Sequence, residues 1–248
     1  MDQRPAITLA RDVDAFITSA APTEPLDIKT PDGYSVWLFA RAVSTYRAAL
    51  LLLEASFGDE AMQLARSLFT DGLRMLELDR LGSERESVLL CWRLRSITET
   101  EHLMEEAVRV GLETDPQPVL DKLAEERASV ERYARRRELA TPTPRDLPTE
   151  KTLAKRFGRM EDYWSFRYAH QFVHGTPVVA SSRLSRAADG THRFDMRASG
   201  AAFAEGTALF LSRYVLLAFS GLMGVLGREE PPELAVLLQR VEEFGSDG

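Results

Sequence analysis

AAFAEGTALFLSRYVLLAFSGLMGVL, residues 201–226, is a long and largely apolar stretch of this 248-residue chain. Arg213 lies in its middle, and a charged side chain at the centre of a lipid bilayer costs several kcal/mol. A second apolar stretch, residues 34–53, carries Arg41 and Arg47 in the same way. Both stretches therefore indicate helices buried in a protein core, and we expect no membrane among the partners of this protein.

The apolar residues of the remaining sequence recur at helical spacing, and the alternation typical of strands is nearly absent. Besides residues 201–226, the expected helices cover residues 34–57, 59–81, 83–111, 117–139, 149–174 and 232–244. We therefore predict an all-α fold, a single-domain helical bundle of about seven main helices. A short hairpin near residues 181–199, with its turn at Asp189-Gly190, is the one candidate for strands.

Turn and capping signals divide the chain. Residues 1–33 form an N-terminal segment that is rich in Pro and Thr towards its end and is expected to be partly loose. Residues 34–248 form the single helical domain. Within it, Ser83 and Glu86 match a capping box that would begin a helix. Three prolines in residues 141–148 predict a loop inside the domain.

Composition and charge restrict the function. The net charge of -7 and the pI of about 5.3 argue against indiscriminate nucleic-acid binding through a basic surface, although they allow a local basic patch. Cys91 is the single cysteine, so no internal disulfide can form, and its apolar surroundings indicate a buried thiol. Charged residues interrupt residues 1–18, where a signal peptide would need an apolar run. We therefore expect a cytoplasmic protein.

The most distinctive local feature is RYAHQFVHG, residues 167–175. On a helix, a sector of about 80° gathers four polar side chains: Tyr163, Arg167, His170 and His174. Apolar and aromatic residues flank this polar seam on both sides. Such an arrangement indicates side chains that face a cleft, another helix or a second subunit rather than open water.

Two interpretations of the polar seam require no nucleic acid. In the first, its side chains form hydrogen bonds across a helix interface within a helical protein-interaction module. In the second, His170 and His174 bind one metal ion from one helix face, as in a metal-dependent hydrolase. Gln171 replaces the glutamate of the HExxH pattern, so a third ligand would have to come from elsewhere. The candidates are Glu99, Glu101, His102 and Glu105. We therefore expect no metal and no cofactor.

The third interpretation rests on a resemblance. The spacing from Arg167 to His174, an arginine followed by six residues and a histidine, resembles the motif of the HEPN superfamily, helical domains that include many RNA-cleaving toxins and defence effectors. The helix end at Gly175 fits, whereas Tyr168 stands where that superfamily usually has a small polar residue. The resemblance implies a metal-independent endoribonuclease, or a catalytically inactive relative, that forms a homodimer. A cognate antitoxin or regulatory protein is a candidate partner.

Two segments resemble an uncharacterised bacterial all-helical family, a domain of unknown function. They are QLARSLFTD, residues 63–71, and FRYAHQFVHG, residues 166–175. Members of that family tend to have a glutamate in place of Asp71. The resemblance implies that Arg66 and Asp71 support the site by approaching the helix that carries His174. A solvated helix face is the alternative for these two residues.

RNA supplies its own nucleophile, the 2′-hydroxyl, so its cleavage requires a base, an acid and a cation that stabilises the charged phosphorane. His174 suits the proton transfers, and the planar fork of Arg167 matches phosphate oxygens. Tyr163 and His170 lie on the same seam as further candidates. The helix rise between Arg167 and His174 is about 10.5 Å, so one copy gives an incomplete site, and a dimer would supply facing pairs.

A substrate path is expected between residues 132 and 159, where nine basic residues stand against three acidic ones. The candidates for RNA binding are Arg135, Arg136, Arg137, Lys155, Arg156 and Arg159. A solvated face or a surface for an acidic protein partner would show the same pattern. RNA cleavage therefore ranks first among the functions, the interaction module second and the metal-dependent hydrolase third.

Overall fold

The computed structural model describes residues 4–23, 30–112, 115–139, 147–173, 184–186, 191–194 and 201–246. By its internal contacts, the chain divides into two compact units: residues 1–80 with 149–248, and residues 81–148. Residues 34–248, predicted as one helical domain, contain the larger part of the first unit and the whole of the second. The described residues have the predicted all-α fold, with one short two-stranded hairpin.

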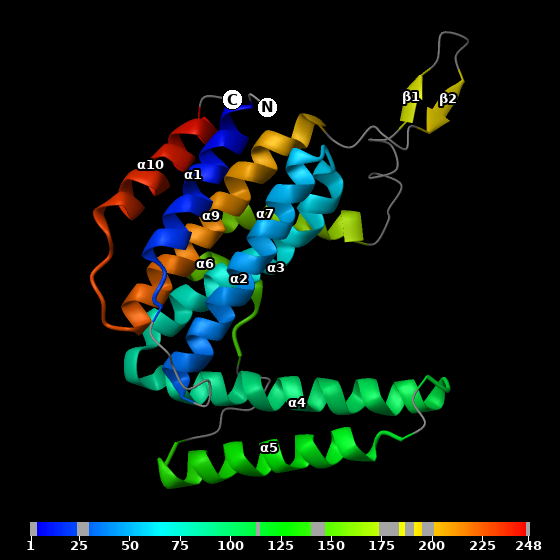
Figure 1. The fold of residues 1–248 in the computed structure, drawn as a ribbon, viewed down its shortest axis with the longest axis vertical. Helices are drawn as coiled ribbons and strands as arrows, with labels where there is room; N and C mark the ends of the chain where they lie inside the picture. The colour runs from blue at the N-terminus through cyan, green and yellow to red at the C-terminus, as the bar shows by residue number, and fades with distance from the viewer. Residues whose placement is uncertain are drawn as a thin grey trace. The chain divides into compact units, whose positions relative to one another are not determined.

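The first unit is built around α9 (Ala201–Val225), which contacts α1 (Pro5–Ala20), α2 (Pro31–Glu54) and α10 (Pro232–Ser246) (Figure 1). Among the described residues, two helices, Asp32–Glu54 and Ala204–Val225, are long and apolar enough to cross a membrane. Most of the second is buried inside the protein. The apolar stretch that ends at residue 226 is therefore the core helix of this unit, as its central arginine predicts.

The other helices described in this unit are α3 (Gly58–Leu81), α6 (Glu150–Arg156) and α7 (Met160–Val173). β1 (Leu184–Arg186) pairs antiparallel with β2 (His192–Phe194). These strands form the expected hairpin, whereas its turn at Asp189-Gly190 lies outside the described residues.

The motif helix is shorter than the sequence predicts. One helix is expected over residues 149–174, but Gly158 separates α6 from α7 because it adopts a φ of 67°, in the left-handed region that glycine tolerates best. The amide of Arg159 donates to the carbonyl of Ala154 at 2.7 Å, which closes the C-terminus of α6. α7 therefore begins as a separate helix at Met160.

α1 lies within residues 1–33, the N-terminal segment in which no helix is predicted. Its apolar residues recur at three- and four-residue spacing and form a fully buried face: Ala6, Ile7, Leu9, Ala10, Val13 and Ile17. Asp12 is exposed, and Arg11 and Asp14 are half-buried on other faces of the helix. The charges that argue against a signal peptide are thus the polar face of an amphipathic helix.

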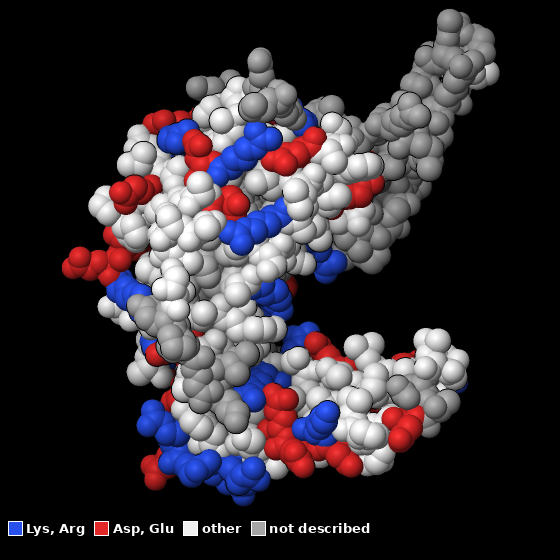
Figure 2. All heavy atoms as spheres, viewed as in Figure 1, with Lys and Arg blue, Asp and Glu red and all other residues white. Residues whose placement is uncertain are grey.

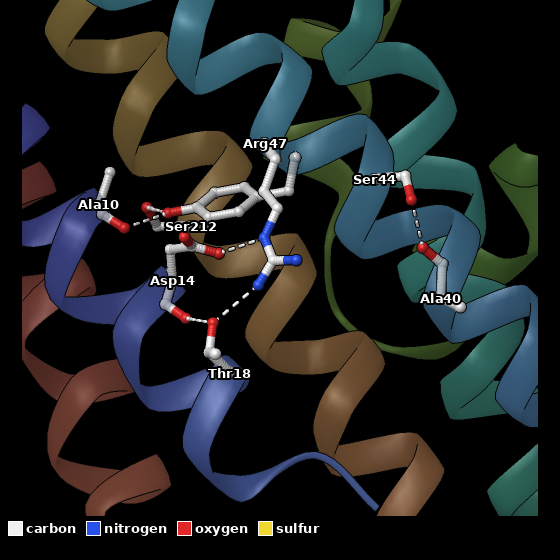
Figure 3. Close-up of polar contacts among 8 residues, drawn as sticks. Ala10, Asp14, Thr18, Ala40, Ser44, Arg47 and Ser212 are labelled. Atoms are coloured by element: carbon white, nitrogen blue, oxygen red, sulfur yellow. Dashed lines mark hydrogen bonds and ion pairs between the residues drawn. The ribbon is translucent and has the colours of Figure 1, made fainter. Parts of the chain in front are cut away.

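A polar network joins α1, α2 and α9 inside the core (Figure 3). The hydroxyl of the buried Tyr46 donates to the carbonyl of Ala10 at 2.7 Å and lies 3.0 Å from the hydroxyl of Ser212. Nearer the surface, Arg47 donates to the Asp14 carboxylate at 2.7 Å. Burial raises the pKa of Tyr46. The phenol therefore stays neutral and keeps its role as a hydrogen-bond donor.

The second unit is a pair of packed helices, α4 (Arg85–Arg109) and α5 (Gln117–Arg136), preceded by the 3₁₀ turn η1 (Gly82–Glu84). Leu90, Val130 and Ala134 form a small buried cluster. Cys91 is buried, as its apolar surroundings predict.

The predicted capping box of Ser83 and Glu86 does not form, because no side chain caps the first turn of α4. Glu86 instead accepts a hydrogen bond from the hydroxyl of Tyr133 and pairs with Arg137 at 3.5 Å. The carboxylate therefore connects α4 with the end of α5 rather than closing its own helix.

The backbones of α3 and α9 approach each other closely where the two helices cross. A Cβ atom on Gly221 would lie 2.6 Å from the carbonyl carbon of Met75, and one on Gly72 would lie 2.9 Å from the carbonyl oxygen of Tyr214. Both neighbours are backbone atoms, which cannot move away alone. Only glycine fits at these two positions.

Gly221→Ala is therefore expected to destabilise the protein by about 1–3 kcal/mol, because the new methyl group would overlap the backbone of α3. Gly206→Ala is the matched control on the same helix, since a Cβ there meets nothing within 4 Å. The control should stabilise the protein by about 0.5–1 kcal/mol through helix propensity. Urea unfolding measures both changes, and two variants of equal stability would contradict the close crossing.

Candidate functional site

A polar pocket of about 480 Å³ lies between α2 and α3. Its lining residues are Arg41, Thr45, Gln63, Arg66, Ser67, Thr70, Asp71 and Arg74. Those of α3 are spaced three and four residues apart, so they share one helix face. Three guanidinium groups, three hydroxyls and one amide surround a single carboxylate. The pocket is therefore locally cationic within an acidic protein.

Asp71 is the buried anchor of this pocket, with a side chain only 2% exposed. Its carboxylate accepts two hydrogen bonds from Arg41 of α2, one of them from Nε at 3.2 Å. Arg41 remains 44% exposed and also lies over the ring of Trp37, 5.4 Å from its centroid. The guanidinium is therefore held in one orientation while part of it faces solvent.

Arg66 connects the pocket to the motif helix. Its guanidinium lies over the ring of Phe166 of α7, 5.7 Å from the centroid. Phe166 is buried and stacks on Phe69 of α3 at 4.8 Å. Arg66 thus approaches α7 as the family resemblance implies. Asp71 does not share this contact, because its hydrogen bonds go to α2.

The structure brings only part of the predicted polar seam into view. Tyr163 is half-buried and stacks on Phe166 at 5.6 Å, whereas Arg167 is exposed. Trp164, expected on an apolar flank, is 68% exposed. The side chain of His170 and the whole of His174 lie outside the described residues. Phe166 is the residue that packs α7 against α3, whereas the neighbouring Arg167 stays exposed.

A second polar cluster on α7 was not predicted. Asp162 accepts hydrogen bonds from Arg213 and from the hydroxyl of Tyr214, both at 2.8 Å. Burial, together with the Asp162 carboxylate, raises the pKa of Tyr214. This cluster attaches the first turn of α7 to α9. The signal in the sequence was Arg213, which an apolar core helix can hold only beside a carboxylate.

Three of the six basic residues predicted to bind RNA form ion pairs within their own unit. Arg137 pairs with Glu86, Arg156 with Glu77, and Arg159 with Glu242 at 3.4 Å. The three remaining candidates, Arg135, Arg136 and Lys155, are exposed, the first two on α5 of the second unit and the third on α6 of the first. On the face shown in Figure 2, basic and acidic side chains are interspersed over the first unit. The predicted substrate path is thus reduced by internal ion pairs.

The metal interpretation gains no support from the part of the chain that the structure describes. Within it, no group of three or more His, Cys, Asp or Glu side chains could hold an ion. The candidate third ligands lie on α4 of the second unit. There His102 contacts Glu105 at 3.3 Å, Glu99 pairs with Arg95 and Glu101 with Arg127.

Asp71 and Glu77 are both buried carboxylates of α3, and their pKa values move in opposite directions. Burial raises the pKa of Asp71 above its ordinary 3.8, and the neighbouring arginines oppose this only in part. Burial acts on Glu77 as well, but hydrogen bonds from Arg80 and Arg156 outweigh it and leave its pKa below the ordinary 4.5.

The two carboxylates should therefore give opposite pH dependence of stability. The contribution of Asp71 to the free energy of unfolding is fully present below pH 3.8 and is lost as pH rises through the raised pKa. The stability of Asp71→Asn relative to wild type should therefore increase as pH rises. The contribution of Glu77 is present above pH 4.5 and is lost as pH falls through the lowered pKa. Glu77→Gln should thus lose stability near neutrality and approach wild type in acid. Urea unfolding from acid to neutral pH measures both, and parallel profiles for the two variants would contradict the opposite shifts.

Comparison with known proteins gives a family but no characterised relative. The model of a family of unknown function (DUF5677) matches residues 32–192, well over half of the chain. The match includes α2, α3 and α7, and so both the pocket and the motif helix. No curated protein and no solved structure matches the chain. The protein therefore belongs to the family of unknown function DUF5677.

Proposed function

We propose that this protein is a metal-independent, HEPN-like RNA-cleaving effector that acts in the cytoplasm as a homodimer. The observation that carries the proposal is the double contact of Arg66, which lines the pocket and also covers Phe166 of the motif helix. This contact supports a phosphate-binding pocket directly beside α7, which carries Arg167 and immediately precedes His174 in the sequence.

The chemistry of the pocket fits a phosphodiester. Arg41, Arg66 and Arg74 present planar donor groups, which match phosphate oxygens better than lysine does. Uncharged hydrogen-bond donors are added by the hydroxyls of Thr45, Ser67 and Thr70. Because one carboxylate stands against three guanidinium groups, a bound phosphate would meet a net attraction.

The cleavage step itself is assigned to α7. The 2′-oxygen attacks phosphorus, the bond from phosphorus to the 5′-oxygen breaks, and the products are a 2′,3′-cyclic phosphate and a 5′-hydroxyl. His174 would transfer the protons, and the exposed Arg167 would stabilise the charged phosphorane. A second copy of the protein would supply the second histidine, with Tyr163 and His170 as further candidates for the site.

Purified protein should accordingly cleave single-stranded RNA in EDTA. His174→Ala and Arg167→Ala should each reduce the rate at least about 100-fold, because each removes a proton-transfer or charge-stabilising group. Arg66→Ala should mainly raise KM, since it weakens binding of the flanking phosphate. His102→Ala is the matched control, because this histidine of α4 is exposed and contacts Glu105 of its own helix at 3.3 Å.

Gel analysis of the RNA and light scattering of the protein measure cleavage and dimerisation. Unchanged rates for His174→Ala would contradict the proposal, as would a strictly monomeric active protein. A wild-type protein that binds RNA without cutting it would be a catalytically inactive relative. Loss of activity in EDTA alone, restored by metal, would favour the hydrolase.

A groove between α1 and α10 favours protein interaction as a second function. It encloses about 660 Å³, and its lining residues are Ala15, Phe16, Ser19, Pro232, Glu233, Val236, Leu237 and Arg240. Val236 is 57% exposed there, although it is a large apolar residue. A cognate antitoxin or regulatory protein that controls the effector would find an apolar docking surface at this groove.

A further inference from the structure

One face of α2 continues from the pocket into an exposed aromatic stack. Tyr34, Trp37, Arg41 and Thr45 are spaced three, four and four residues apart, so their side chains share that face. Arg41 and Thr45 line the pocket. The two aromatic residues lie on the preceding turns of the same helix. The stack and the pocket are therefore neighbouring parts of one surface.

The members of the stack are in direct contact. The rings of Tyr34 and Trp37 have centroids 5.3 Å apart and planes inclined by 28°. The guanidinium of Arg41 lies over the Trp37 ring at 5.4 Å, and Asp71 holds that guanidinium from the other side of the pocket. Trp37 is nevertheless 41% exposed. A rigid aromatic surface is thus presented to solvent beside a cationic pocket.

This combination matches the two chemical parts of a nucleotide. Phosphate oxygens bind guanidinium and hydroxyl donors, whereas a base stacks on aromatic rings and on guanidinium planes. Trp37 and Arg41 are separated by about 6 Å of helix rise, which is comparable to the reach from phosphate to base within one nucleotide. A duplex keeps its bases stacked on one another, so only an unpaired base could use the ring of Trp37.

We infer that the α2 face binds single-stranded RNA, with an unpaired base against the Tyr34–Trp37 stack and its phosphate in the pocket of Arg41 and Arg66. The inference rests on the proposed function and deepens it, because it names unpaired loops and ends as the substrate class. It assigns Trp37 to base binding and the pocket to phosphate binding.

The test is a binding titration with a short single-stranded oligonucleotide whose sugars are all 2′-O-methylated, followed by fluorescence anisotropy. This probe lacks the nucleophile and cannot be cleaved. Trp37→Ala should lose about tenfold in affinity, as expected for one stacked base, whereas Trp37→Phe should keep most of it. Phe244→Ala is the matched control, because Phe244 of α10 is an aromatic residue of similar exposure, 43%, and it should bind like wild type.

Two further measurements separate base contacts from phosphate contacts. The affinity of wild type for an abasic strand of equal length should not exceed the affinity of Trp37→Ala for the full probe. Trp37→Ala should not lower the affinity for the abasic strand any further. Arg66→Gln should reduce the slope of log affinity against log salt concentration by about 0.7, whereas Trp37→Ala should leave that slope unchanged. A duplex of the same sequence should show no dependence on Trp37.

Equal affinity of wild type and Trp37→Ala for the probe would overturn the inference, as would an equal loss with the abasic strand. If Trp37→Ala does not fold, Trp37→Leu takes its place in the titration. Equal affinity of Trp37→Leu and Trp37→Phe for the probe would then overturn the inference. The proposed function fails separately. Protein that binds the probe through Trp37 but never cleaves RNA refutes cleavage alone, whereas cleavage that is indifferent to Trp37 refutes only the base contact.

Discussion

The close crossing of α3 over α9 determines where the polar side chains of α3 lie. With Gly72 against Tyr214 and Gly221 against Met75, α3 cannot rotate or slide without a clash between backbones. The face that carries the pocket residues is therefore directed away from the contact with α9. Both neighbours of that face, α2 and α7, then meet α3 in fixed register, through an ion pair on one side and stacked rings on the other.

The two buried carboxylates of α3 show how the pocket differs from an ordinary structural ion pair. Glu77 is surrounded by two arginines that more than offset its burial. Asp71 receives hydrogen bonds from Arg41 and lies near Arg74, and its burial is not fully offset. Incompletely compensated charges of this kind reduce stability and gather at functional sites. The same carboxylate holds the Arg41 guanidinium in one orientation, as a preformed phosphate site would require.

The helical class and the core helix follow from the sequence, because a long apolar run around one central arginine needs a buried environment. α1 is hard to predict because charged residues on its outer faces interrupt the apolar run. The break at Gly158 is hard to predict because a single glycine inside an apolar period is a weak signal. The pairing of Arg41 with Asp71 joins residues 30 positions apart, about which helical periodicity carries no information. The three- and four-residue spacing of polar side chains on α3 is evident in the sequence, but without the contact to α2 it is also typical of a solvated helix face.

Internal ion pairs would also constrain how this acidic protein contacts the RNA proposed as its substrate. To reach a phosphate, Arg159 would have to leave Glu242, and Arg156 would have to leave the buried Glu77, which would keep its pair with Arg80. Three of the six basic candidates take part in these pairs, so uncharged contacts would have to add to the affinity of the protein for RNA. The exposed aromatic surface beside the pocket would supply such contacts, and only to RNA whose bases are unpaired.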